Sequence, residues 1–89
     1  MSYAHNPTLA AAAANLRAVL RSLAVCSGQP IEEGQEAVAF ESVRDFINMI
    51  IEYNGQSSYI GISAFQTLQT ITPAWLVFAN ARDGDPANL

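Results

Sequence analysis

The sequence predicts an all-α fold, a small bundle of three to four short helices that is expected to dimerise. Apolar residues recur every three or four positions, and Gly and Pro residues divide the chain into four segments, 7–26, 31–54, 57–71 and 73–82. The 89 residues suffice for one domain, residues 7–84, with flexible tails at 1–6 and 85–89. Hydrophobic residues make up 51% of the chain and charged residues only 13%, which favours self-association because few charges are left to cover a small surface.

The first segment has the start signal of a helix, since Asn6 can cap it and Pro7 suits the first helical position. Its larger apolar residues share one face at about 100° per residue, namely Leu9, Leu16, Val19, Leu20 and Leu23. A face of small residues lies on the far side: Ala11, Ala14, Ala18 and Val25. This helix is expected to end near Cys26, before Ser27 and Gly28.

The second segment starts near Pro30 and is expected to end before Gly55. Gly34 weakens its first turn, so the regular helix is expected to begin near Gln35. The predicted core face consists of Ala39, Phe40, Val43, Phe46, Ile47 and Ile50. Further apolar residues widen the apolar arc to about 220°, with Val38, Met49 and Tyr53 on one side and Ile51 on the other.

The third segment, 57–71, leaves two readings open. Ile60 and Ile62 alternate with smaller residues, as in a strand, whereas Ala64, Phe65 and Leu68 follow helical spacing. We favour a helix, because a lone strand would have no partner in this sequence. The fourth segment, 73–82, opens with Thr72 as a cap and Pro73 at the first helical position, and it stops before Gly84.

No motif for catalysis, metal binding or cofactor binding stands out, and we expect the protein not to be an enzyme. The single histidine, His5, lies in the expected tail, and Cys26 lies at a helix C-terminus, where the helix dipole disfavours a thiolate. Two carboxylate pairs are spaced one helical turn apart, Glu32 with Glu36 and Glu41 with Asp45. Such pairs are most often solvated helix faces rather than metal sites.

The charge balance and the pattern of apolar residues exclude some classes of partner and indicate a compartment. The net charge is −4, and the basic residues are four arginines opposed by eight acids, which argues against binding to DNA or RNA. No apolar run reaches the roughly 20 residues of a membrane span. Arg17 and Arg21 fall inside the apolar N-terminal run instead of before it, unlike in an export signal. A cytoplasmic location is therefore expected.

The surplus of apolar helix surface predicts a protein–protein interface. The candidate residues are Ala11, Ala14, Ala18, Val25, Val38, Met49, Ile51 and Tyr53, with Arg17 and Arg21 as possible partner contacts. The function we favour is a small acidic regulatory protein that binds and restrains another protein, such as a transcription activator or a toxin. One alternative is a chaperone or assembly subunit for a secreted or membrane complex. Another is a helical bundle that binds a small hydrophobic ligand near Trp75 and Phe78.

Overall fold

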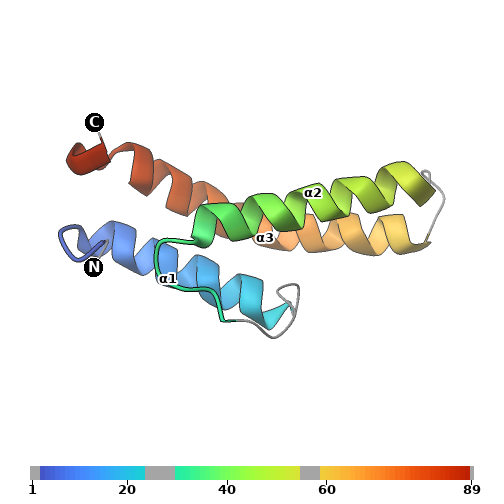
Figure 1. Ribbon diagram of the computed structural model, residues 1–89, viewed down its shortest axis with the longest axis horizontal. Coiled ribbons are helices and arrows are strands. Elements are labelled where there is room, and N and C mark those ends of the chain that lie inside the picture. The colour runs from blue at the N-terminus through green and yellow to red at the C-terminus, as the bar shows by residue number, and fades with distance from the viewer. Residues whose placement is uncertain (1–2, 24–29, 55–58, 89) are drawn as a thin grey trace.

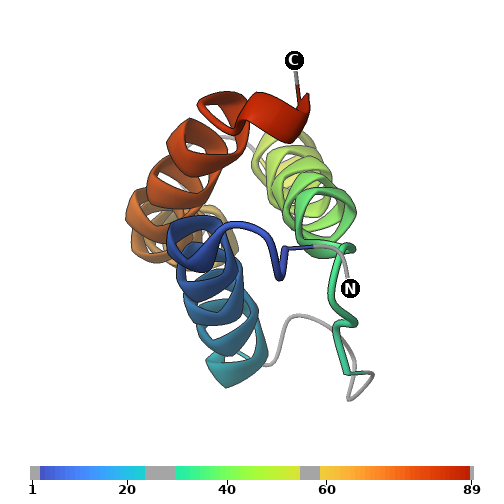
Figure 2. The ribbon, with the colours of Figure 1, turned by 90° about the vertical axis from the view of Figure 1, so that its left-hand side faces the viewer.

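The computed structural model describes residues 3–23, 30–54 and 59–88, and in these ranges it is all-helical. The helices are α1 (Pro7–Ser22), α2 (Glu36–Asn54) and α3 (Tyr59–Asp83), followed by the short 3-10 helix η1 (Pro86–Asn88). α1 and α2 run in the same direction, and each packs along α3, which runs the opposite way (Figure 1). Seen end-on, the three helices surround a common centre (Figure 2). The predicted all-α fold is confirmed.

α1 begins as the sequence predicts and ends earlier. The side chain of Asn6 accepts a hydrogen bond from the backbone N–H of Leu9 at 3.1 Å, and Pro7 is the first helical residue. The helix ends at Ser22, so the expected end at residue 26 is wrong, while Ser27 and Gly28 lie outside the described residues.

α2 begins at Glu36, five positions after the expected start of the segment at 31 and next to the predicted regular start near Gln35. Gly34 explains the delay. Its φ of 95° lies in the left-handed region, which a right-handed helix cannot include and which glycine adopts without steric cost.

α3 joins the third and fourth predicted segments into one helix of 25 residues, so the predicted break at Pro73 is wrong and the strand alternative does not apply to residues 59–71. The hydroxyl of Thr72 does not cap a new helix but donates to the backbone carbonyl of Leu68 at 2.6 Å. Residues on both sides of Pro73 also bury one continuous face, because Ile71, Ala74 and Phe78 are all buried at helical spacing. Tertiary packing thus outweighs the local cost of the proline.

The core is formed by one face of each helix. Its buried apolar residues are Leu9, Ala12, Ala13, Leu16, Leu20, Phe40, Val43, Ile47, Ala64, Ile71, Ala74 and Phe78. Most of the predicted core positions of α1 and α2 are therefore buried or partly buried. Phe46 is the exception, because its side chain is 58% exposed, and its predicted place in the core is wrong.

Residues of the two expected tails make contacts in the structure. Nε2 of His5 lies 2.6 Å from Oδ2 of Asp85, a buried carboxylate, and Tyr3 packs edge-to-face on Phe78. The chain ends described here therefore lie against each other. The domain boundaries themselves stay a prediction.

Candidate interaction surface

Four large apolar side chains on α2 are exposed and lie along one face of the helix. Their exposed fractions are 61% for Val38, 58% for Phe46, 56% for Met49 and 88% for Tyr53. At 100° per residue they fall within an arc of about 80° that points away from the buried face of Phe40, Val43 and Ile47. We call these four residues the α2 stripe. The exposed Ser42 lies within the same arc between Val38 and Phe46, so the stripe is apolar except at this position. Exposed apolar side chains gathered on one face of a small domain are typical of an interaction site.

α1 is shorter than α2 and lies beside only its first turns (Figure 1). Arg17 of α1 binds Glu36, the first residue of α2, so the two residues lie at about the same level. Beyond Arg17, α1 has only five more residues, 18–22, which extend about 7.5 Å, whereas the 19 residues of α2 extend about 28 Å. The C-terminal half of α2 consequently runs past the end of α1 and is paired with α3 alone (Figure 1).

Acidic side chains border the stripe on one side. Val38 forms this edge of the stripe. On the helical wheel, three exposed acids lie about 20°, 40° and 60° beyond it, namely Asp45, Glu52 and Glu41. The one arginine of α2, Arg44, lies about 100° further round than Asp45, and its contact with Asp45 is an exposed one at 3.4 Å. Such an exposed pair contributes little energy. The rim of the stripe is therefore negatively charged.

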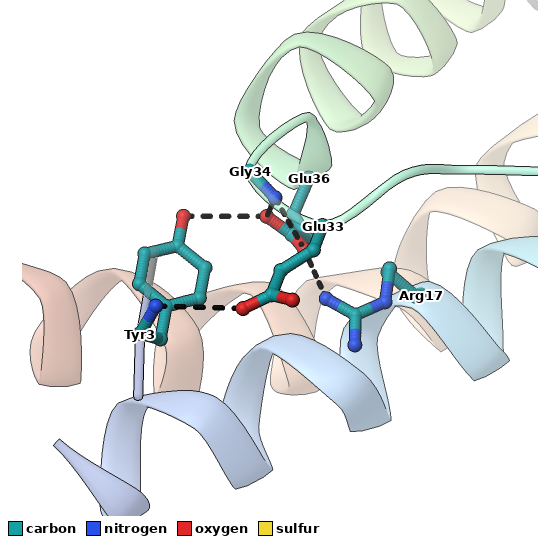
Figure 3. A network of polar contacts seen from close by, with 5 residues as sticks. All are labelled: Tyr3, Arg17, Glu33, Gly34 and Glu36. Atoms are coloured by element: carbon teal, nitrogen blue, oxygen red, sulfur yellow. Dashed lines mark hydrogen bonds and ion pairs between the residues drawn. The ribbon is translucent and has the colours of Figure 1, made fainter. Parts of the chain in front are cut away.

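A buried polar network fixes the start of α2 against α1 (Figure 3). The carboxylate of Glu36, which is fully buried, accepts a hydrogen bond from Nη1 of Arg17 and hydrogen bonds from the backbone N–H of Gly34 at 3.1 and 3.2 Å. The hydroxyl of Tyr3 also donates to it at 3.3 Å. The backbone N–H of Tyr3 donates to Glu33 at 3.4 Å. The network thus ties the N-terminal segment, α1 and α2 together.

Burial is the main reason that the pKa of Tyr3 is raised above its usual value of 10.0, and the neighbouring negative charge of Glu36 raises it further. The pKa of Asp85 is lowered, chiefly because His5 donates a hydrogen bond to its carboxylate. A carboxylate only accepts hydrogen bonds, so Nε2 of His5 carries the proton in this contact.

Trp75 and Phe78, the predicted pocket residues, are packed within an aromatic cluster. Trp75 stacks on Phe40 with ring centroids 4.3 Å apart, and the guanidinium of Arg82 lies 5.4 Å from the Trp75 ring and 5.6 Å from the Phe78 ring. Phe78 is only 1% exposed. The stack of Phe40 on Trp75 joins α2 to α3, and the contacts of Arg82 lie within α3.

The other predicted interface residues fall into three groups. Ala11, Ala14 and Ala18 are exposed on α1. Ile51 is partly buried and packs against the core, and Val25 lies outside the described residues. Of the two predicted partner contacts, Arg21 is exposed, while Arg17 is engaged by Glu36. The structure therefore brings Val38, Met49 and Tyr53 into one surface and adds Phe46 to it.

Sequence reasoning missed Phe46 and the partners of Glu36 and His5. Phe46 was placed in the predicted core face, but its side chain is 58% exposed and belongs to the stripe. The partners of Glu36 and His5 are distant along the chain, with Arg17 19 residues from Glu36 and Asp85 80 residues from His5. A glutamate in the first turn of a helix is common, because the helix dipole favours a negative charge there, so Glu36 gave no local signal of its partners.

Within residues 3–23, 30–54 and 59–88, no three His, Cys, Asp or Glu side chains lie together as metal ligands would. None of the helices described there combines the length and the apolar character needed to cross a membrane.

Comparison of the chain with models of protein families, with curated proteins and with solved structures gave no match.

Proposed function

We propose that the protein is a small, non-enzymatic regulatory interaction protein of the cytoplasm that binds and restrains a partner protein through the α2 stripe. The observation that carries the proposal is the exposure of Val38, Phe46, Met49 and Tyr53 along one face of α2. Full burial of a fully exposed Val, Phe or Met side chain contributes about 1.5–3 kcal/mol. Val38, Phe46 and Met49 are 56–61% exposed, so a partner that covers them gains a part of that amount from each.

The mechanism we propose is occlusion. A rigid helix face that covers an apolar patch on a partner blocks whatever that patch otherwise binds, and no chemical step is required. The network around Glu36 supports this role, because it holds the start of α2 against α1 and so presents the stripe in one orientation. A pre-positioned surface loses less conformational entropy on binding than a mobile one.

The proposal includes self-association, for which the low charge content of 13% is the support. A symmetric dimer of the helical domain is the expected form. Light scattering at low micromolar concentration measures this directly, and a monomeric mass would contradict the dimer while leaving the binding of a partner protein open.

Affinity co-purification from a native lysate tests the function. The bait is the wild-type chain, with Met49→Glu as the stripe variant and Val77→Glu as its matched control, because Val77 is similarly exposed, at 59%, on α3. We expect a regulator or toxin to be captured by the wild type and by Val77→Glu, and to be lost with Met49→Glu. Capture of an export substrate would favour the chaperone alternative. Equal capture by both variants would show that the stripe is not the binding surface.

A further inference from the structure

We infer that the occupant of the α2 stripe is an amphipathic helix of a partner protein whose apolar face is edged by Lys or Arg. This inference rests on the proposed function, because it specifies the partner of the same surface. The stripe is a row along one helix, running from Val38 to Tyr53 over about 22 Å, or four helical turns. A helix laid along it can place apolar side chains at intervals of three and four residues against this row.

The charge of the rim selects the sign of the partner. Glu41, Asp45 and Glu52 stand exposed along one edge of the stripe, and Arg44 lies on the other side of these acids. An acidic helix docked here would place like charges along the whole edge, whereas Lys or Arg side chains would meet the three carboxylates. Charge complementarity of this kind mainly sets specificity and the rate of association.

The size of the stripe favours a single helix over a broad protein surface. The two aromatic side chains, Phe46 at 58% and Tyr53 at 88% exposure, together offer roughly 200–350 Å² of apolar surface. A standard protein interface buries about 800 Å² on each partner. Even with Val38 and Met49 added, the stripe suits one helix and a reversible contact rather than an extensive interface.

A second copy of the chain is disfavoured at this surface. In an antiparallel two-fold pair of α2 helices, each flank faces the same flank of the other copy, so Glu41, Asp45 and Glu52 would oppose their own equivalents. In a parallel pair, the acids would face the opposite edge of the stripe, where Ala39 and Ile50 lie on the helical wheel and no basic residue of α2 is found. The net charge of −4 per chain adds a repulsive contribution to either arrangement. Self-association therefore uses a surface other than this one.

Fluorescence anisotropy with dye-labelled synthetic helices tests the inference on the full chain. Two amphipathic peptides of about 18 residues share one leucine face, and their flanks carry either lysine or glutamate. We expect the Leu/Lys peptide to bind at least about tenfold more tightly than the Leu/Glu peptide and to weaken as salt is raised. The combined change Glu41→Gln, Asp45→Asn and Glu52→Gln is expected to remove most of that difference.

A second set of variants localises the binding. Phe46→Ala with Met49→Ala is expected to weaken the Leu/Lys peptide about tenfold, and the matched pair Leu76→Ala with Val77→Ala, exposed on α3, to change it less than about twofold. Circular dichroism confirms that each variant is folded. Equal binding of the two peptides, or equal losses in the two variant pairs, would overturn the inference.

Two experimental outcomes distinguish a failure of this inference from a failure of the proposed function. If sedimentation shows a dimer that Phe46→Ala with Met49→Ala dissociates, the occupant is a second copy and the inference is overturned, although the stripe remains a binding surface. If the co-purified partner is retained by Met49→Glu, the proposed function itself fails, whatever the peptides do.

Discussion

Glu36 is fully buried, yet its carboxylate accepts hydrogen bonds from Arg17, Tyr3 and the backbone of Gly34. A buried ion pair adds little net stability over an apolar replacement, but the loss of one partner leaves the other charge uncompensated. The side chain of Arg17 retains 20% exposure, so water partly screens its charge. The network therefore specifies the position of α2 more than it stabilises the fold.

Substitution of Arg17 is predicted to destabilise the folded chain. Arg17→Ala should lower the free energy of unfolding by about 3 kcal/mol, because it leaves the carboxylate of Glu36 buried without its ion-pair partner. Urea unfolding followed by circular dichroism measures the change. The double variant Arg17→Met with Glu36→Leu is the control and should recover most of the loss. A loss of less than about 1 kcal/mol in Arg17→Ala would show that the ion pair is not important for stability.

The contact between His5 and Asp85 predicts a dependence of stability on pH. The pKa of Asp85 is lowered in the folded chain. The stabilisation that its ionised carboxylate gives to the fold is therefore present above the usual carboxyl pKa of 3.8, and it is lost as the pH falls through the lowered pKa. Asp85→Asn should therefore destabilise the protein at pH 7 and bring little change in strong acid. Thermal unfolding of both proteins across this pH range provides the measurement. A difference in melting temperature between the two proteins that stays constant with pH would contradict a stabilising role for the ionised Asp85.

At the scale of the helices, local signals predicted some boundaries closely, namely the start of α1 at Pro7 and the end of α2 at Asn54, whereas the end of α1 and the break at Pro73 were wrong. The cap of Asn6 and the position of Pro7 depend on neighbouring residues only, and both are confirmed. The helix break predicted at Pro73 was wrong because a Thr–Pro pair can open a helix or lie within one. Burial of Ile71, Ala74 and Phe78 on one face decides between these possibilities, and that information is tertiary.

Pro73 lies inside α3, where it removes one backbone hydrogen bond and crowds the preceding turn. Pro73→Ala should therefore raise the free energy of unfolding by about 1–2 kcal/mol, after the larger entropy of the unfolded alanine chain is allowed for. Thermal denaturation tests this, with the exposed substitution Thr70→Ala in the same helix as the control. A lower melting temperature for Pro73→Ala would mean that the packing of α3 requires the proline.

For the whole molecule, the sequence indicated a surplus of apolar surface, and the structure shows where much of it lies. Val38, Met49 and Tyr53 were predicted from the width of the apolar arc on α2 and are exposed. Phe46 was expected in the core, and its 58% exposure is set by how the helices pack, which no local pattern encodes. The helical periodicity is local and could be predicted, whereas the offset between helices is set by contacts such as Arg17 with Glu36.

The account also predicts that the stripe contributes little to folding. Met49→Glu should leave the helix content and the free energy of unfolding nearly unchanged, within about 0.5 kcal/mol, because the side chain is 56% exposed. Circular dichroism and urea unfolding check this. A strongly destabilised variant would indicate that Met49 is packed within the folded chain.

Site-specific photo-crosslinking in the cells that make the protein tests the central claim most directly. A photoreactive phenylalanine analogue replaces Tyr53 in the stripe or Val77 on α3, and the adducts are separated by mass. The account predicts a discrete adduct with another protein from position 53 and none of comparable yield from position 77. No adduct from position 53, or the same adducts from both positions, would show that the α2 stripe is not a binding surface.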